Sequence, residues 1–390
     1  MSARGQAAPR VAAEGTDPDL LTAVIAWLLA PRRSADGLRR RCAEIEASEP
    51  GHRLGAALST PSVTQREAAE VTLGAWRRLG VRVALVGDPA YPSQLAAGWP
   101  ATPGPVLLSW LGQPPIDGPS VAVVGARRAT GYGTGVASWL AATVARAGVH
   151  VISGGARGID AAAHRAALEE PGGTSVVLGC GHAVGYPRDH AAPGGLFDQV
   201  LDHGGSLLSE QLPDARPHAG NVRARNRIVA GLCHAVVVVE GGERSGALLT
   251  AGAAADRGVP VLAVPGDVRA PGSAAPHELL AEGAAPCRGP GDLLEMLGTV
   301  TAPAGARAGQ TDHPGDTVGA AAPAGLPPDL AAVLAECWPR PVRVEELARR
   351  TGRSVPTLLG ALTQARLTGT VAESVEGVRL RRAPSTPDAG

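Results

Sequence analysis

The sequence predicts an α/β fold: a doubly wound parallel sheet, preceded by a helical domain and followed by a small winged-helix domain. Short apolar runs rich in β-branched residues recur through the middle of the chain, at Ser120–Val124, Val149–Ser153, Thr174–Leu178, Ser206–Leu208, Ala235–Glu240 and Pro260–Val264. Helical patterns separate these runs, which indicates βαβ units in a parallel sheet. Ligands of such sheets bind outside the carboxyl ends of the strands. The loops that follow the strands therefore form the candidate site.

The sheet domain is flanked by segments of different composition. Asp17 as N-cap and Pro18 as the first helical residue start the helical region. A segment with almost no large apolar side chain separates the sheet domain from the tail and is typical of a flexible linker. The predicted segments are a disordered stretch (1–16), a helical domain (17–80), a strand with a Pro-rich connection (81–119), the sheet domain (120–298), the linker (299–325), the winged-helix domain (326–382) and a tail (383–390).

The overall composition limits the classes of function. The formal net charge of the 390 residues is zero and aromatic residues make up 3%. A nucleic-acid role therefore requires a local basic patch. With so few aromatic side chains, extensive stacking of bases on the protein is not expected. The five scattered cysteines indicate reduced thiols in a cytosolic protein, with neither a disulfide framework nor a metal site. No apolar run reaches the length that spans a bilayer.

The loop after Ser120–Val124 has the features of a phosphate-binding turn. It runs from Gly125 through Arg127 to Thr130 and opens a helical pattern. The N–H groups of a helix N-terminus carry partial positive charge, which suits a phosphate. Arg127 adds a planar and permanently charged guanidinium beside that position.

The loop after the second strand of the sheet domain is rich in glycine. Residues 153–160 read SGGARGID, and glycines let the backbone approach a ligand closely. Asp160 and His164 follow, and their residue types are compatible with a catalytic acid–base pair. We favour the structural interpretation, in which Asp160 caps the helix and His164 packs on its first turn.

Three arginines, Arg223, Arg225 and Arg227, lie together before an apolar helix face. They have no nearby acid in the sequence, and crowding like charges is unfavourable unless an anion arrives. One interpretation is a helix start with solvated arginines. Their position before another strand of the sheet favours phosphate binding.

The loop after Ala235–Glu240 again leads into a helix. Ser245 and Gly246 open that helix and offer N–H groups and a hydroxyl. Glu240 is either a catalytic carboxylate or the partner of an arginine, and the many arginines nearby favour the second interpretation.

Together these loops resemble the DNA-processing protein A (DprA, also called Smf) family. The matching segments are VAVVGARRATGYG, SGGARGIDAAAH, YPRDH, LLSE, RNRIVAG, VVVEGGERSGALLTA and VLAVPGD, which cover residues 88–297 almost continuously. The tail is similar to the winged-helix unit that many members carry. The N-terminal helices resemble the small helical domain of the family, of the SAM or helix-hairpin-helix type.

The resemblance implies an extended Rossmann-like domain that binds single-stranded DNA, forms a homodimer and hands the strand to the recombinase RecA. It implies no catalytic residue and no cofactor. The residues implied to bind DNA are Gly125, Arg127, Thr130, Ser153, Gly154, Arg157, Arg223, Arg225, Asn226, Arg227, Ser245 and Gly246, and those implied to support the site are Asp160, His164 and Glu240.

The chain departs from the family pattern at three places. Val222-Arg223 stands where members usually have Phe-Pro, so a base-stacking contact is lost and the charge of Arg223 is expected to offset it. His277 takes the place of an asparagine. Ala247 replaces the second serine of a Ser-Gly-Ser run.

Two enzymatic alternatives use a similar fold. A nucleotide phosphoribohydrolase of the lysine-decarboxylase-like group carries P-G-G-x-G-T-x-x-E where this chain has Glu240 to Gly246, and the proline, threonine and later glutamate are missing. A dinucleotide oxidoreductase needs G-x-G-x-x-G, which the loop from Gly125 to Thr130 lacks.

The winged-helix tail is predicted to hold three helices, at 329–337, 344–350 and 354–367, and a strand pair over 371–382. The third of these helices carries little charge. A helix that reads DNA presents polar and basic side chains to the groove. Residues 355–366 contain a single charged side chain, Arg366. We therefore predict that this helix packs or binds protein more than it reads bases.

Overall fold

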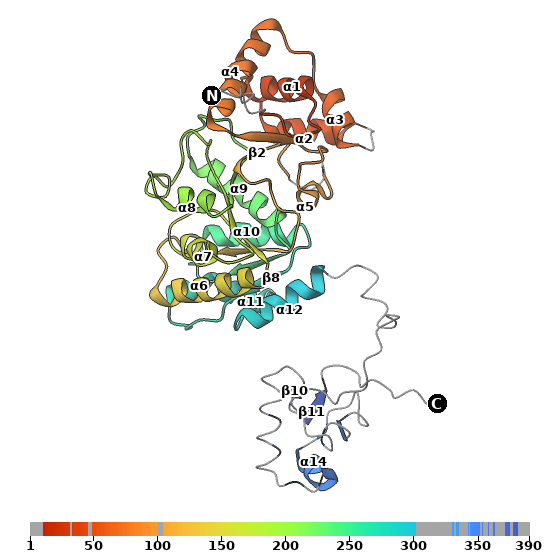
Figure 1. Ribbon diagram of the computed structural model, residues 1–390, viewed down its shortest axis with the longest axis vertical. Coiled ribbons are helices and arrows are strands. Elements are labelled where there is room, and N and C mark those ends of the chain that lie inside the picture. The colour runs from red at the N-terminus through yellow and green to blue at the C-terminus, as the bar shows by residue number, and fades with distance from the viewer. Residues whose placement is uncertain are drawn as a thin grey trace, which may run out of the picture. The chain divides into compact units, whose positions relative to one another are not determined.

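The computed structural model describes residues 11–31, 33–45, 49–99 and 104–301, and scattered positions between 330 and 380. The chain divides into two compact units, residues 1–308 and 309–390. Figure 1 shows both units, with labels on most of the helices and on some of the strands. The first unit holds the predicted helical region and the sheet.

The predicted helical region forms four helices in the described residues. Asp17 caps the first of them, because its side chain accepts hydrogen bonds from the backbone N–H groups of Asp19 and Leu20. Ser62 and Gln65 form a capping box at the start of the fourth. The helices are α1 (Pro18–Leu29), α2 (Ala35–Ala43), α3 (Pro50–Ala57) and α4 (Val63–Leu79).

Residues 11–16, predicted to be disordered, are ordered. Val11 and Ala13 are buried and exchange backbone hydrogen bonds with Val83. The hydroxyl of Thr16 donates to Asp88 at 2.6 Å. The prediction of disorder is therefore wrong for residues 11–16. Their small side chains are buried beside the edge of the sheet, a contact that the composition of the segment did not indicate.

The sheet has nine strands in the order β1-β2-β6-β5-β4-β3-β7-β8-β9 within the described residues. All the predicted strands are present. The seven neighbouring strands β6, β5, β4, β3, β7, β8 and β9 are parallel, as predicted. The strands are β1 (Arg82–Leu85), β2 (Leu107–Gly112), β3 (Ser120–Val124), β4 (His150–Ser153), β5 (Thr174–Val177), β6 (Ser206–Ser209), β7 (Ala235–Val238), β8 (Val261–Ala263) and β9 (Ala285–Pro286).

The sheet as a whole is mixed, because two antiparallel strands from the segment before residue 120 extend the predicted parallel part. β2 runs antiparallel to both β1 and β6. It lies in the segment predicted as a Pro-rich connection, and its apolar residues Leu107 and Leu108 are buried. Because of the prolines around it, this segment was predicted as a connection. It contains a strand that extends the sheet toward the N-terminal helices.

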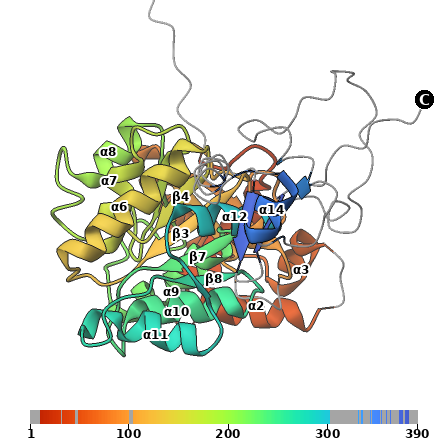
Figure 2. The same ribbon diagram turned by 90° about the horizontal axis from the view of Figure 1, so that it is seen from below.

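Helices cover both faces of the sheet. Along β3, Val121 and Val123 pack with α6, α7 and α12, whereas Ala122 and Val124 belong to the core that includes α9, α10 and the N-terminal helices. Figure 2 shows α6 and α7 on one side of the strands and α9 and α10 on the other. These helices are α5 (Ser93–Ala96), α6 (Gly131–Arg146), α7 (Ile159–Ala167), α8 (Leu196–Asp202), α9 (Ala219–Gly231), α10 (Gly246–Ala255), α11 (Ala274–Ala281) and α12 (Pro290–Thr301), with a short 3-10 helix at Pro271–Ser273.

The strand order places a switch point between β3 and β7. From β3 the chain builds outward through β4, β5 and β6, and it then returns to β7 on the other side of β3. The helices that follow β3 and β7 lie on opposite faces of the sheet. The loops therefore diverge there and leave the crevice in which ligands of doubly wound sheets bind.

The second unit has a core of its own. Its described elements are α14 (Val344–Thr351) and an antiparallel pair, β10 (Val371–Ser374) and β11 (Gly377–Leu380). Leu347, Val371 and Val378 are buried together. The predicted second helix and strand pair are present, whereas most of the predicted helices at 329–337 and 354–367, and the linker beyond residue 301, lie outside the described residues.

Candidate nucleic-acid interface

The loops at the switch point surround a groove of about 950 Å³, which we call the main groove. Loops after β3, β4 and β7 and one face of α9 contribute to its walls. A side pocket of about 140 Å³ shares several of these residues. Of the predicted site residues, Gly125, Arg127, Gly154, Asp160, Arg223, Arg225, Asn226, Ser245 and Gly246 line the main groove, and Arg157 lines the side pocket.

The two cavities concentrate positive charge. Arg127, Arg223 and Arg244 are exposed on the main groove, and Arg128 is exposed on the side pocket. Within the described part of the chain, none of the four forms an ion pair or a side-chain hydrogen bond. Since the net charge of the whole chain is zero, this unpaired charge is a local feature and favours an anionic ligand.

Arg225 lies beneath the groove wall rather than on its surface. Its residue exposure is 6%, and Nη1 donates to the carbonyl of Val177 at 2.6 Å. Burial lowers the pKa of the guanidinium, and the charge of Asp160 opposes this shift. Gly154 passes directly over the guanidinium, which leaves no room for a side chain at that position. Arg225 thus supports the β4–α7 turn and adds positive charge from below.

Asp160 holds the same turn from the other side. It lies within the first turn of α7, whose N-cap is Gly158, so the predicted N-cap role is wrong. Its carboxylate accepts hydrogen bonds from the backbone N–H groups of Gly154 at 3.1 Å and Ala156 at 3.3 Å. Burial raises the pKa of Asp160, while Arg225 and these N–H groups oppose the rise.

His164 lies in the core and lines neither cavity. It is fully buried, and Nδ1 lies 2.7 Å from the hydroxyl of Thr174. Burial lowers its pKa to about 3. A neutral imidazole within the core, away from the lining of either cavity, is unsuited to acid–base chemistry in the groove.

Glu240 ties the loop after β3 to the loop after β7. The predicted arginine partner is wrong: the carboxylate accepts hydrogen bonds from the backbone N–H and the hydroxyl of Thr130. Thr130 is itself the N-cap of α6 and accepts from the N–H of Gly133 at 3.1 Å. Both residues therefore shape the switch point without lining the main groove.

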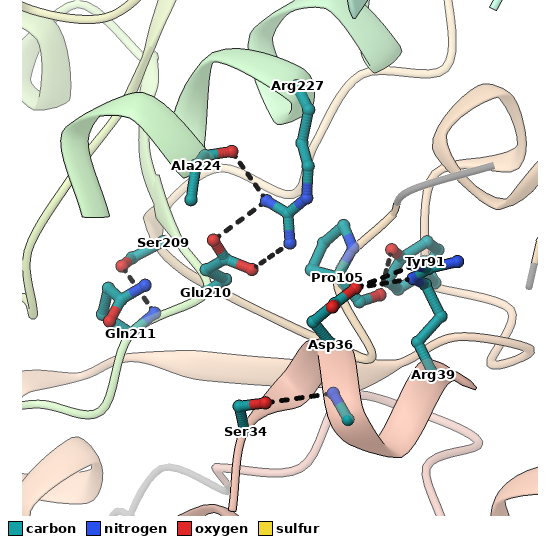
Figure 3. Close-up of polar contacts among 11 residues, drawn as sticks. Ser34, Asp36, Arg39, Tyr91, Pro105, Ser209, Glu210, Gln211, Ala224 and Arg227 are labelled. Atoms are coloured by element: carbon teal, nitrogen blue, oxygen red, sulfur yellow. Dashed lines mark hydrogen bonds and ion pairs between the residues drawn. The ribbon is translucent and has the colours of Figure 1, made fainter. Parts of the chain in front are cut away.

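Ser153 and Arg227 also lie off the groove lining. The hydroxyl of Ser153 donates to the carbonyl of Val123 at 2.7 Å inside the sheet. Arg227 forms a two-pronged ion pair with Glu210, at 2.9 and 2.6 Å, which Figure 3 shows. The groove-facing stripe of α9 runs through Val222, Arg225, Asn226 and Val229, and Arg227 points away from it. Neither residue lines the main groove or the side pocket.

Two helix N-termini face the main groove. Ser245 caps α10 by accepting from the N–H of Ala247, and His218 caps α9 by accepting from Gly220 and Asn221. The first residues of both helices line the groove. Asn226 links the helices, since its Nδ2 donates to the carbonyl of Gly246 at 3.1 Å. The partial positive charge of both helix ends adds to that of the arginines.

Comparison with known proteins assigns the family. The model of the family described as DNA recombination-mediator protein A matches residues 82–298, more than half of the chain. The chain belongs to this family. A second match, to the DprA winged helix domain, covers residues 319–374. The resemblance found in the sequence is thereby confirmed, and the chain is a member of a family of DNA-processing proteins.

Individual members of the DNA recombination-mediator protein A family agree with this assignment. Protein Smf of Escherichia coli K12 is 40% identical over 266 residues, which cover 67% of this chain and 68% of that protein. The putative DNA processing protein DprA of Mycobacterium tuberculosis H37Rv is 42% identical over 229 residues, but the match spans only 57% of its length. The X-ray structure of DprA from Streptococcus pneumoniae superimposes with a TM-score of 0.56 at 26% identity, covering 72% of this chain and 98% of that one.

Membership does not favour the phosphoribohydrolase alternative, and the geometry agrees. Glu240, the carboxylate at the position of that enzyme's loop, is bound to Thr130. Among the described residues that line the main groove, Asp160 is the acidic one, and it is bound to backbone N–H groups. Both carboxylates are thus engaged in hydrogen bonds within the protein.

Sequence reasoning assigned no role to three residues of the interface. Arg244 and His218 line the main groove, and Tyr186 lines both cavities. Tyr186 stands in the YPRDH segment, whose match to the family was the available signal. His218 is the N-cap of α9, and Arg244 precedes Ser245, the N-cap of α10. Residues at a helix N-terminus are candidates for contacts with an anion.

Other features of the described residues concern metals and membranes. They contain no group of three or more His, Cys, Asp and Glu side chains arranged to hold a metal ion. No described helix is long and apolar enough to cross a membrane. Cys42, Cys180, Cys233 and Cys287 are buried, unpaired thiols, and Cys337 lies outside the described residues.

Proposed function

We propose that this chain binds single-stranded DNA in the main groove, with the backbone phosphates held by Arg127, Arg223 and Arg244. The observation that carries the proposal is the gathering of these unpaired guanidinium groups in one groove at the switch point. Guanidinium groups and helix N-termini are the groups with which proteins bind phosphates. Arg225 and Asp160 support the turn after β4, which forms part of the wall of the main groove.

The apolar part of the same groove supports a single strand over a duplex. Val222, Val229, Leu248 and Leu249 line it together with the arginines. In a duplex the faces of the bases are stacked and hidden, whereas a single strand exposes them to such surfaces. Contacts to phosphates carry no sequence information, so we expect little sequence preference.

Family membership supports a further step. We propose that the bound strand is handed to the RecA recombinase, and that the chain acts as a homodimer formed through the sheet domain. Both rest on the resemblance to DNA-processing protein A and on the name of the family, DNA recombination-mediator protein A. RecA assembly on strands coated with single-strand-binding protein, measured with and without this chain, tests the first, and sedimentation tests the second.

Binding is tested by fluorescence anisotropy with a labelled oligonucleotide and its duplex across a salt series. We expect tighter binding of the single strand and a slope of log K against log salt of about −2, since each of three phosphate contacts contributes about −0.7. Arg127→Ala is expected to weaken binding of all sequences alike and to reduce the slope by about 0.7.

Arg78→Ala is the matched control, because Arg78 is an exposed arginine of α4 that lines neither cavity. It is expected to bind as the parent does. Equal affinities of the parent and Arg127→Ala for single strands would contradict the proposal.

A further inference from the structure

The outer face of α6 carries two exposed aromatic rings. Tyr132 is 56% exposed and Trp139 is 53% exposed. One other aromatic side chain of the described residues is exposed, that of Tyr186, which lines both cavities. The other described rings are buried, except Trp27, which lies under the guanidinium of Arg33. Because aromatic residues make up 3% of the chain, two such rings on the surface of one helix indicate a surface that binds a partner.

Both rings of α6 are held in place. The hydroxyl of Tyr132 donates to the carbonyl of Pro265 at 3.1 Å. A Cβ atom on Gly289 would lie 2.8 Å from the ring of Trp139, so this ring rests directly on the backbone at Gly289. Each ring is thus fixed on one side by a loop and remains exposed on the other. A surface that is already fixed loses little conformational entropy when it binds.

The two rings lie on the same side of α6. Seven residues separate Tyr132 from Trp139, which is close to two full turns, so the rings stand about 10 Å apart along the helix axis. An extended single strand can place separate bases on two such rings, because every base has a face that stacks.

The charges around the rings favour a polyanion. α6 contains no acidic residue, and Arg146 at its far end is its one charged side chain. Two acids close in sequence to the loop contacts of the rings, Asp267 and Asp292, are each paired with an arginine. Arg128 precedes α6, is exposed and forms no ion pair within the described part of the chain.

We propose that a single strand leaving the main groove past Arg128 lays bases on Tyr132 and Trp139, so that the outer face of α6 continues the binding site. The inference rests on the proposed binding of single-stranded DNA and lengthens the path of the strand. The loop that carries Arg127 and Arg128 leads directly into α6, so the cavities and the rings are joined by a short piece of chain. The faces of the bases are hidden in a duplex, so this extension favours single strands.

The length of the oligonucleotide separates the extension from the groove. The parent, Trp139→Leu and Trp139→Phe are compared by anisotropy on thymidine oligomers of about 4 to about 16 nucleotides, the range of site sizes found for single-strand-binding folds. On the shortest oligomer all three are expected to bind alike, because the groove alone holds it. On the longest we expect Trp139→Leu to bind about tenfold more weakly than the parent, and Trp139→Phe to stay within about threefold, since it keeps a ring.

Val71→Ala is the matched control for an exposed apolar side chain. Val71 is 71% exposed on α4 and lines neither cavity, so this variant is expected to bind every oligomer as the parent does. A long oligomer made only of abasic units tests the stacking itself. The parent and Trp139→Leu are expected to bind it alike, and a loss there equal to that on thymidine would contradict the proposal.

Tryptophan fluorescence gives a measurement on the ring of Trp139. A base that stacks on an indole quenches its emission, so the longest thymidine oligomer is expected to quench the parent more than Trp139→Phe. The buried Trp76, Trp99 and Trp110 are the same in both proteins, and the difference therefore reports on Trp139. Equal quenching of the two proteins would overturn the proposal.

The outcomes also distinguish this inference from the proposed function. If the parent binds single strands of no length, the proposed function falls. If the parent binds and Trp139→Leu matches it at every length, only the extension over α6 falls. If Trp139→Leu binds as the parent does but sediments differently without DNA, the rings are an interface between copies of the chain, which also overturns the proposal.

Discussion

The guanidinium of Arg225 occupies the space in which a side chain of residue 154 would stand. A Cβ atom on Gly154 would lie 1.8 Å from Nη1 of Arg225. Nη1 donates to the carbonyl of Val177, so the guanidinium cannot withdraw without leaving a buried carbonyl unpaired. The turn after β4 and the helix α9 are thus fitted to each other, and this fit places the wall of the main groove.

Gly154→Ala is therefore expected to disturb both the fold and the groove. Overpacking of this kind lowers the free energy of unfolding by about 2 kcal/mol. Displacement of Arg225 also shifts the turn, so single-strand affinity is expected to fall. Urea denaturation measures the first effect and anisotropy measures the second.

Gly135→Ala is the control for this substitution. Gly135 lies in α6, and nothing stands within 4 Å of the position of its Cβ atom. Alanine favours a helix interior over glycine by roughly 1 kcal/mol, so stability should hold or rise. Equal losses in the two variants would show that the fit between Gly154 and Arg225 has no special importance.

The position of the site followed from the sequence, whereas its internal contacts did not. Parallel strands end at one edge, so the loops carrying Arg127, Gly154 and Ser245 had to lie near one another. The partner of Glu240 is Thr130, and that pairing depends on β3 and β7 being neighbours. The alternation of helices and strands in the sequence predicts a parallel sheet. It does not show which strands are neighbours in that sheet.

The spacing of the arginines likewise left their directions open. Arg223, Arg225 and Arg227 were treated as one cluster before a helix, but all three lie within α9. Successive residues of a helix point about 100° apart, so Arg225 is buried while Arg227 meets Glu210. The helix begins after its N-cap, His218, so all three arginines are helical and point in different directions. The sequence did not show where the helix begins, and it therefore did not show which arginines face the groove.

Asp189→Asn is expected to strengthen DNA binding. Asp189 now holds Arg157 in an ion pair with distances of 3.1 and 2.6 Å at the side pocket. The pair is exposed, so its loss costs little stability. Release of Arg157 adds one cation for a phosphate, and the salt slope is expected to steepen by about 0.7. A salt series on the parent and the variant measures this, and unchanged slopes would place Arg157 outside the path of the strand.

Stability is expected to fall as the pH is lowered below about 6.5, the ordinary pKa of histidine. Burial lowers the pKa of His164 to about 3 and that of His182 to about 4. Between those values and 6.5 the unfolded chain binds protons that the folded chain does not, so each histidine removes stability at about 1.4 kcal/mol per pH unit. Urea midpoints from pH 7 to 4.5 measure the trend.

His164→Asn is the informative variant for that series. Its amide N–H can replace Nδ1 as the donor to Thr174, and asparagine does not titrate. The variant is expected to show a flatter dependence of stability on pH than the parent. The same slope in both would mean that His164 does not bind a proton on unfolding in this range.

Arg227→Ala is expected to separate stability from DNA binding. The side chain of Glu210 is 7% exposed, and Arg227 is its ion-pair partner. Loss of the guanidinium leaves a buried carboxylate unpaired, which costs about 3 kcal/mol. Burial works to lower the pKa of Arg227, but the charge and hydrogen bonds of Glu210 outweigh it and raise that pKa, so Arg227 keeps its charge at neutral pH.

The double substitution Glu210→Gln with Arg227→Met is expected to recover much of the lost stability, because it leaves no buried charge. Its affinity for single strands and its salt slope should equal those of the parent, since Arg227 lies off the groove lining. Arg127→Ala should give the opposite pattern, with parental stability and a reduced slope. A reduced slope in the double variant would instead return Arg227 to the DNA-binding set, because only a lost phosphate contact changes that quantity.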